Sequence, residues 1–353
     1  MSSNIPSSLH YPLGERVPAP GQALTVAPGV RWLRLGLPFA LDHINLWLLK
    51  DTEGWTLVDC GIDSPQSRDT WLQLEAQVLQ GQPVRRIVVT HMHPDHVGLA
   101  HWLCERWQAP LWMNAEEYRT AAQAIEPEHH LGGPASIEFF RQHGWTPAQI
   151  EVLQRRPYEF NTMVPRLPAL HQTLSEGQRL HTLGDDGQPA EWICLKGLGH
   201  SPEHMALHQA RDRVLISGDM LLPSISTNIS VWPSQPDADP LRGFLDALAA
   251  MQPLPDDTLV LPSHGRPFIG AALRIRQLQG HHAGRLQRLL EHCTLAPRTA
   301  SEVLEVLFER ELNDQQMSFA TGEAIAHLNH LWLGGQLRRE ADAQGVWRFG
   351  ATA

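Results

Sequence analysis

Short stretches in which apolar and polar residues alternate occur in both halves of the chain, and this alternation predicts half-buried β-strands. In the first half they cover residues 23–36, 44–61, 86–90 and 110–114, and in the second half 190–197, 204–209, 213–219 and 258–265. Apolar residues at helical spacing fill segments between them, at 65–80, 98–107, 115–124 and in two short helices between 134 and 156. Strands alternating with helices predict an α/β layered domain, in which functional sites lie beyond the strand ends.

From about residue 271 the pattern becomes helical and ends in a hairpin. We expect helices at 271–293, 299–312 and 321–337, with Thr299 and Thr321 as N-caps and Gly334–Gly335 as a stop, then a hairpin at 338–350. Because a single core stops growing at roughly 250–300 residues, the 353 residues predict two units of unequal size. These are a larger domain at 23–280, with a helical insertion at about 115–165, and a smaller domain at 281–353, after an irregular extension at 1–22.

The composition is that of a folded protein, with 42% hydrophobic and 19% charged residues. A formal net charge of -10 disfavours broad attraction to nucleic acid or anionic lipid. The four cysteines are far apart and form no CxxC pair, which favours reduced thiols. Since the chain shows no signal-peptide pattern and no apolar stretch of roughly 18 residues, we expect a cytoplasmic protein without membrane association.

Residues 90–98 read THMHPDHVG and bring three histidines and an aspartate close together. Side chains at i and i+2 of an extended chain share a face, so His91 and His93 can reach one cation. Asp95 and His96 follow a proline that turns the chain, and they point elsewhere. This arrangement suits two metal ions better than one, and cations would satisfy polar groups that are otherwise costly to bury.

Three further residues, each directly after a predicted strand, are able to complete such a site. They are His200, Asp219 and His264, and each is flanked by Gly or Pro, as expected where the backbone turns sharply to aim a side chain. Taken alone, each is better explained as a structural residue. Together with the motif at 90–98, and in this order along the chain, they indicate a site for two metal ions.

Five short motifs follow one another along the chain: LVDCG at 57–61, HxHxDH at 91–96, GH at 199–200, GD at 218–219 and SHG at 263–265. In these motifs the chain resembles the metallo-β-lactamase superfamily, closest to its glyoxalase II-like and thioesterase or lactonase branches. The resemblance covers about residues 24–267 and implies an αβ/βα sandwich of two mixed sheets flanked by helices. It implies one metal on His91, His93 and His200, a second on Asp95, His96 and His264, a bridge by Asp219, and Asp59 orienting a ligand without binding metal.

The chemistry expected of such a site is hydrolysis. Two cations about 3.5 to 4 Å apart can share a water and lower its pKa toward neutrality. We therefore expect a metal-bridging hydroxide to attack an acyl carbonyl, with Asp95 accepting the proton left behind. Imidazole and carboxylate ligands suit zinc, which we favour, and also iron or manganese.

The family resemblance ranks the possible small-molecule acyl substrates. A thioester of the acyl-CoA or acylglutathione type comes first, ahead of a lactone or other ester. A ribonuclease of the same superfamily is the alternative enzyme, because an activated water can also attack phosphorus. A nucleic-acid or signal-binding protein that uses the metals structurally is the alternative without catalysis.

Several other residues are candidates for supporting roles, each with a plainer alternative. His204 orients a ligand or contacts substrate, or it simply begins a strand. Four residues in or just before a proline-broken connector at 157–170 either contact an anionic substrate or form a solvated face: Arg155, Arg156, Tyr158 and Asn161. The residues that follow Asp219 line the pocket or cap turns: Ser224, Thr227 and Asn228.

The C-terminal unit resembles the winged-helix domain that follows the catalytic domain in some members of this superfamily. Winged helices often bind DNA, but residues 296–353 hold five arginines against eight acidic residues, a net charge of -3. A module that follows phosphates would be basic. We therefore expect this unit to pack against the catalytic domain or a partner subunit, as in a homodimer, without binding nucleic acid.

Overall fold

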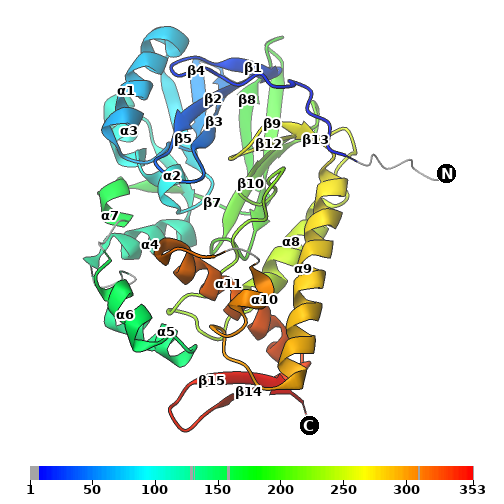
Figure 1. Ribbon diagram of the computed structural model, residues 1–353. Helices are drawn as coiled ribbons and strands as arrows, with labels where there is room; N and C mark the ends of the chain where they lie inside the picture. The colour runs from blue at the N-terminus through cyan, green and yellow to red at the C-terminus, as the bar shows by residue number, and fades with distance from the viewer. Residues whose placement is uncertain (1–7, 128–129, 131, 157–159, 309–310, 353) are drawn as a thin grey trace, which may run out of the picture.

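Two mixed β-sheets form the centre of the computed structural model, which describes residues 8–127, 130, 132–156, 160–308 and 311–352 (Figure 1). The first sheet has the strand order β1 to β7, with antiparallel pairs from β1 to β4 and parallel pairs from β4 to β7. Its strands are β1 (Leu24–Ala27), β2 (Val30–Gly36), β3 (His43–Asp51), β4 (Gly54–Val58), β5 (Val84–Val89), β6 (Leu111–Asn114) and β7 (His171–Leu174).

The second sheet has the order β13-β12-β11-β10-β9-β8, and only its β11–β12 pair is parallel within the described chain. Its strands are β8 (Arg179–Leu183), β9 (Pro189–Gly197), β10 (His204–Gln209), β11 (Val214–Gly218), β12 (Leu259–Pro262) and β13 (Phe268–Ile269). The parallel strands of both sheets end toward the same side of the molecule. That side carries the candidate metal ligands.

Buried side chains alternate between the two faces of each sheet, which fills the space between the sheets and the space under the helices. Trp47 on β3 and Trp192 on β9 belong to the cluster between the sheets, whereas Leu46, next to Trp47, belongs to the cluster under the helices. The helices on the first sheet are α1 (Pro65–Leu74), continued by a π-helical turn (Glu75–Leu79), α2 (Pro94–Val97) and α3 (Ala100–Trp107). Those on the second sheet are α8 (Pro240–Met251) and α9 (Ala271–Leu295). The predicted sandwich of two mixed sheets flanked by helices is therefore confirmed.

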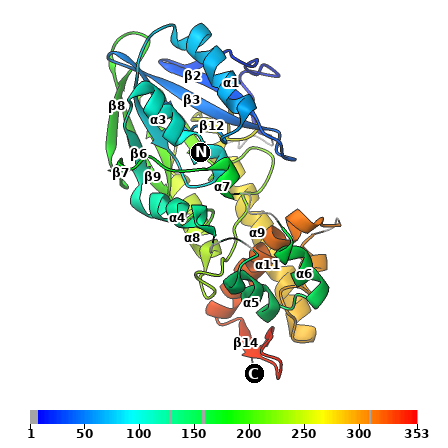
Figure 2. The same ribbon diagram turned by 90° about the vertical axis from the view of Figure 1, so that its left-hand side faces the viewer.

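The described part of the segment between β6 and β7 contains the helices α4 (Ala115–Ile125), α5 (Pro134–Gln142), α6 (Pro147–Gln154) and α7 (Phe160–Met163). Figure 2 shows α5 and α6 beside α11, away from the sheets. Their buried Phe140, Trp145 and Leu153 share one apolar cluster with the C-terminal region, and the Trp145 indole donates a hydrogen bond to Thr321 Oγ1 at 3.0 Å. The insertion thus joins the two parts of the chain.

The C-terminal region consists of helices and a hairpin: α10 (Leu304–Leu307), α11 (Asp314–Leu333), β14 (Leu337–Ala341) and β15 (Trp347–Ala351). The expected helix at 299–312 is wrong, since only four of the residues described in this range are α-helical. Thr299 closes a turn instead, because its hydroxyl accepts from Glu302 N at 3.2 Å. Thr321 as an N-cap is also wrong. Asn313 caps α11 by a reciprocal capping box with Gln316, and Thr321 lies inside the helix, where its hydroxyl donates to Met317 O.

Several elements were not among those expected from the sequence pattern. Strands β7 and β8 are short edge strands with mixed polarity, so their alternation is weak. Helix α8 carries clear signals, with Asp239 as N-cap and Pro240 at the first position, and it is absent from the expected set. Strand β13 has only two residues.

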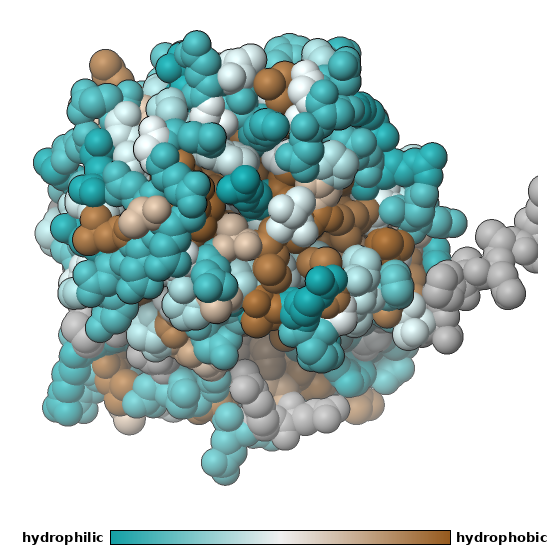
Figure 3. All heavy atoms as spheres, turned by 90° about the horizontal axis from the view of Figure 1, so that it is seen from above, coloured by the Kyte–Doolittle hydropathy of each residue, from teal (hydrophilic) through white to brown (hydrophobic). Residues whose placement is uncertain are grey.

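Residue 280, the expected domain boundary, lies inside the continuous helix α9. The division into domains stays a prediction. Seen from the end of the sandwich shown in Figure 3, hydrophilic residues predominate, with apolar ones gathered toward the middle of the face. Within the described ranges, no helix combines the length and the apolar character needed to cross a lipid bilayer.

Candidate metal centre

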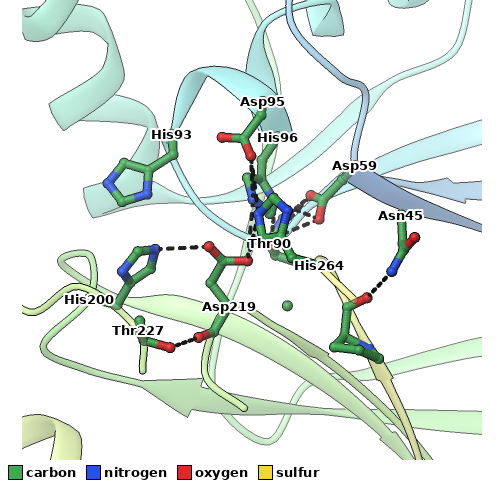
Figure 4. A network of polar contacts seen from close by, with 12 residues as sticks. Asn45, Asp59, Thr90, His93, Asp95, His96, His200, Asp219, Thr227 and His264 are labelled. Atoms are coloured by element: carbon green, nitrogen blue, oxygen red, sulfur yellow. Dashed lines mark hydrogen bonds and ion pairs between the residues drawn. The ribbon is translucent and has the colours of Figure 1, made fainter. Parts of the chain in front are cut away.

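All seven predicted metal ligands lie at one edge of the sandwich, each just beyond a strand or on the short helix α2 (Figure 4). His91 and His93 follow β5, and α2 then presents Asp95 and His96 from the next turn. His200 follows β9, Asp219 follows β11 and His264 follows β12. The parallel strands β11 and β12 place Asp219 and His264 side by side, because parallel strands end at the same edge of a sheet.

Three overlapping groups of these side chains have their ligand atoms within 4.8 Å of one another. The groups are His91, His93 and His200; His91, His96 and Asp219; and Asp95, His96 and His264. In the first group, His91 Nε2 lies 2.9 Å from His93 Nδ1 and 3.3 Å from His200 Nε2. In the third, His264 Nε2 lies 3.3 Å from Asp95 Oδ2, and His96 Nε2 lies 3.6 Å from the same oxygen.

Asp219 lies between the first and third groups, with one oxygen turned to each. Its Oδ2 is 3.3 Å from His200 Nε2. Its Oδ1 is 3.5 Å from both His96 Nε2 and His264 Nε2. A carboxylate in this position is able to bridge two cations.

The residues present fit a pair of divalent cations, as two observations show. His96 Nε2 and Asp219 Oδ1 are buried, and neither has a hydrogen-bond partner among the described residues. In addition, His91, His93 and His200 turn ring nitrogens toward one another, as three imidazole ligands of a single cation would. Nitrogen and oxygen donors of this kind suit zinc, iron or manganese.

The pKa values of the imidazoles differ between the two halves of the site. Burial lowers the pKa of His93 to about 3 and holds the pKa of His91 well below its usual value. Burial also acts to lower the pKa of His96 and His264, but adjacent carboxylates outweigh it and raise these values to about 9 and about 11. For His96 these are Asp59, Asp95 and Asp219, and for His264 they are Asp219 and Asp95. The carboxylates on the His96 and His264 side therefore favour the protonated forms of these two imidazoles.

Asp59 supports His96 from behind. Its Oδ2 accepts a hydrogen bond from His96 Nδ1 at 2.8 Å, and its Oδ1 accepts from the Thr90 amide at 2.8 Å. The residue has a φ of 63°, a left-handed conformation that turns the chain sharply after β4. Asp59 therefore contacts the candidate ligand His96 and is not itself in any of the three ligand groups.

Two further imidazoles are oriented by main-chain carbonyls. His200 Nδ1 donates to Asn228 O and His264 Nδ1 donates to His43 O, each at 2.8 Å. Each bond keeps a proton on Nδ1 and leaves Nε2 free to bind a cation. The sequence contains no signal for these partners, because any residue type can supply a carbonyl.

His204 begins β10 and lies behind Asp219. Its Nε2 accepts a hydrogen bond from the Asp219 amide at 3.3 Å, and the ring is completely buried. The adjacent Gly218 has a φ of 53°, and a Cβ atom there would lie 2.1 Å from His204 Nε2. His204 therefore supports the turn that carries Asp219.

Glu117 on α4 is a supporting residue that the motifs do not reveal. One oxygen accepts from the Met92 amide at 2.9 Å, and the other accepts from Ser201 Oγ at 2.6 Å and the Glu203 amide at 2.7 Å. It thus ties the loop of His91 and His93 to the loop of His200. Burial raises the pKa of this carboxyl, although its three hydrogen bonds oppose the rise. Its place in the first turn of a helix is a common position for a surface glutamate, so the sequence hides its role.

The predicted substrate contacts lie in different settings. Arg155 is exposed at the end of α6 and pairs with Glu151 of the same helix, and Arg156 donates to Ser318 Oγ at 3.2 Å. Thr227 is buried, and its hydroxyl donates to Asp219 O, so this side chain supports the metal loop and does not face a pocket. The remaining residues are Asn161 on α7, exposed Ser224, half-buried Asn228, and Tyr158, which lies outside the described residues.

Comparisons with known proteins agree with this geometry. Residues 40–264 match the family model of the metallo-beta-lactamase superfamily, and residues 286–352 match that of the metallo-beta-lactamase-like C-terminal domain. The chain is 26% identical to the probable metallo-hydrolase YqjP of Bacillus subtilis (strain 168) over 314 residues, which are 85% of this chain and 91% of that protein. It is 22% identical to the probable metallo-hydrolase YflN of the same organism, over 72% of this chain and 90% of that protein.

Two solved structures extend the likeness to nearly the whole chain. The crystal structure of a beta-lactamase domain protein from Burkholderia ambifaria is 46% identical, covers 98% of each chain and superposes with a TM-score of 0.90. The metallo-beta-lactamase family protein TTHA1429 from Thermus thermophilus is 27% identical, with a TM-score of 0.74 over 92% of this chain and 99% of that one. With its sandwich fold, its histidine and aspartate clusters and these matches, the chain belongs to the metallo-β-lactamase superfamily.

Proposed function

We propose that this protein is a metal-dependent hydrolase that acts on a small acyl substrate, with a thioester of the acyl-CoA or acylglutathione type ranked first and a lactone or other ester second. The observation that carries the proposal is the position of Asp219, whose two oxygens face two separate groups of ligands. Such a site would hold two cations, both next to the reacting group of one substrate. The ranking of the thioester rests on the resemblance of the motifs to the glyoxalase II-like branch.

Each half of the site would hold one divalent ion, and we propose zinc for both. His91, His93 and His200 would bind one ion, and Asp95, His96 and His264 the other, with Asp219 between them. Bound cations of this type supply Lewis acidity toward a carbonyl oxygen and an activated water. The protein supplies the fixed orientation of the ligands, through the bonds from Asp59, Asn228 O and His43 O.

Asp95 is the residue best placed to move a proton. Its side chain is 17% exposed, against 11% for Asp219, and Oδ2 faces His264. Burial acts to raise its pKa, but His96 and His264 outweigh this and hold the pKa at about 2. The carboxylate is therefore ionised near neutral pH. Oδ2 would bind the ion together with His96 and His264, which leaves the other oxygen to accept a proton.

Purified protein with a measured zinc content, supplied with an acyl-CoA, an acylglutathione, a homoserine lactone and single-stranded RNA, tests the proposal directly. We expect hydrolysis of a thioester. Asp219→Ala and His264→Ala should each lower the rate by at least about 100-fold, as for other groups needed in the transition state. Circular dichroism should show that both variants stay folded.

Cleavage of RNA without hydrolysis of any ester would reverse the ranking. The net charge of -10, and of -3 in residues 296–353, weighs against RNA as the substrate. We propose instead that the C-terminal region, with its winged-helix-like order of helices and hairpin, serves to pack against the catalytic part. Full activity of the His264→Ala variant would mean that one metal ion suffices.

A further inference from the structure

Helices α9 and α11 of the C-terminal half carry a buried ion pair between Arg285 and Glu323. Arg285 NH1 pairs with Glu323 Oε1, and both residues are less than 10% exposed. Burying two charges costs several kcal/mol per ion, and an apolar pair of similar size is often at least as stable. A buried pair therefore calls for a reason other than stability.

The second oxygen of Glu323 leads toward the metal site. Glu323 Oε2 accepts from Asn228 Nδ2 at 3.4 Å, which is longer than the usual N–H···O distance of about 2.7–3.2 Å and makes this a weak bond. Ser230 Oγ donates to Asn228 Oδ1 at 2.7 Å, so both ends of the Asn228 amide are held. Asn228 directly follows Thr227 in the segment after Asp219. Figure 4 shows Thr227 near His200 and bonded to the main chain of Asp219.

The same segment meets α11 at close range. Val231 N donates to Gly322 O at 3.1 Å. A Cβ atom on Gly322 would lie 2.8 Å from Ser230 Oγ and 2.9 Å from Ser230 Cβ, so only glycine allows this approach. The loop and the helix thus form one packed unit.

From the other side, Asn228 O accepts the hydrogen bond from His200 Nδ1 at 2.8 Å. This bond fixes the rotation of the imidazole and its tautomer, with Nε2 turned to His91 and Asp219. Any shift of the Asn228 carbonyl therefore moves a metal ligand. Arg285 is thus connected to His200 through two residues, Glu323 and Asn228.

We propose that Glu323, held by Arg285, is a positioning residue for His200, and that the C-terminal region thereby sets the affinity of the His91, His93 and His200 half of the site for its metal ion. The inference rests on the metal centre described under Proposed function. It assigns to the C-terminal region a part in metal binding, in addition to packing. Glu323 itself touches neither substrate nor metal.

Zinc affinity of the full-length protein, measured by competition with a chromophoric chelator, provides a readout that does not depend on substrate. In Glu323→Gln the charge that Arg285 holds is lost while the size is kept. We expect one of the two zinc ions to bind about tenfold more weakly, the low end for residues that orient a ligand, and the other to bind as before. Asn228→Ala, which leaves the carbonyl in place but removes its anchors, should weaken the same ion.

Thr321→Val is the matched control. It removes a buried hydrogen bond from the same helix, the one from Trp145, at a position two residues from Glu323. It should lower the melting temperature and leave both zinc affinities unchanged. A purely structural role for Glu323 would give the same result as this control.

A double-mutant cycle identifies the ligand through which Glu323 acts. In a His200→Ala background, Glu323→Gln should cause no further loss of zinc affinity, whereas in a His264→Ala background it should keep its full effect. Folded Glu323→Gln and Asn228→Ala proteins that bind two zinc ions with wild-type affinity would overturn the inference alone. A wild-type protein that binds no divalent ion would overturn the proposed function, and the inference with it.

Discussion

At the scale of single residues, the site depends on which nitrogen of each imidazole is protonated. His96, His200 and His264 each donate from Nδ1, to Asp59, Asn228 O and His43 O respectively. Their Nε2 atoms are thereby directed to the shared space around Asp219. The orientation of each of these three imidazoles is thus fixed by a partner on a different segment of the chain.

Gly218 is the residue whose backbone conformation matters most for Asp219. We predict that Gly218→Ala destabilises the protein by at least about 1 kcal/mol, because a side chain at positive φ is strained and the new Cβ would collide with His204 Nε2. Since Asp219 follows directly, the zinc content should fall as well. Urea unfolding and metal analysis of the purified variant measure both effects.

Gly280→Ala is the control for this substitution. Gly280 is exposed inside α9, and a Cβ atom there meets nothing within 4 Å. Alanine favours the helix over glycine, so this variant should be more stable by about 0.5–1 kcal/mol and keep its zinc. A Gly218→Ala protein as stable as Gly280→Ala would show that the turn before Asp219 accommodates a side chain.

Site residues whose side chains belong to a motif could be predicted from the sequence. Residues that act through their main-chain atoms could not. The seven candidate ligands follow from residue type, spacing and strand ends, and the structure brings them together. Asn228 was expected near the pocket, yet its carbonyl is what contacts His200. Glu117 joins two ligand loops from a helix that the sequence pattern presents as ordinary.

At the scale of elements, the contact between α9 and α11 contains two neutral histidines. His282 Nδ1 donates to His327 Nε2 at 3.1 Å, and His327 Nδ1 donates to Glu323 O at 2.8 Å. Both rings are fully buried. Burial lowers the pKa of His282 to about 2 and that of His327 to about 3.

These pKa values predict a loss of stability in acid. An unfolded histidine takes up a proton below about pH 6.5, whereas the folded pair does not until about pH 3. The unfolded state therefore binds more protons in this pH window. As the pH is lowered through it, the free energy of unfolding decreases by up to about 1.4 kcal/mol per pH unit for each histidine. His282→Asn, which keeps a donor for His327 Nε2 but does not titrate, should reduce this slope.

Urea unfolding of both proteins between pH 7.5 and 5.0, at one fixed zinc concentration, measures the slope. Other buried histidines contribute equally to both proteins, so the difference between the two slopes isolates His282. Equal slopes in the variant and the wild type would contradict the prediction.

The longer strands and helices were predictable because their apolar residues repeat with a clear period. β3 and β9, for example, lie where the alternation predicts strands. The short α10 and the start of α11 were not, since they depend on tertiary contacts: Thr321 looks like a cap, but Asn313 begins the helix and Trp145 from the insertion uses the Thr321 hydroxyl.

At the scale of the whole molecule, one apolar cluster joins the second sheet, the insertion and the C-terminal region. It contains Val260 from β12, Phe140 from α5, Leu289 from α9 and Phe349 from β15, all buried. We therefore predict a single cooperative unfolding transition for the zinc-loaded protein by scanning calorimetry. A chain cut after residue 295 should fail to fold into a soluble protein, because buried residues such as Leu289 and Phe244 would lose their cover.

Two well-separated calorimetric transitions would contradict this prediction and favour independent domains on either side of residue 280. The contact between Glu323 and Asn228 would then join two separately stable units. A folded, zinc-binding protein that ends at residue 295 would have the same meaning.

The amino-acid order was enough to establish the layered α/β architecture, the metal-ligand types and their sequence along the chain. These properties follow from local periodicity and from residue chemistry, which are written in the chain directly. The joining of Arg285, Glu323, Asn228 and His200 into one path depends instead on contacts between residues far apart in sequence. Such contacts arise when the chain packs its apolar faces, and a polar residue's role there depends on neighbours that no local pattern specifies.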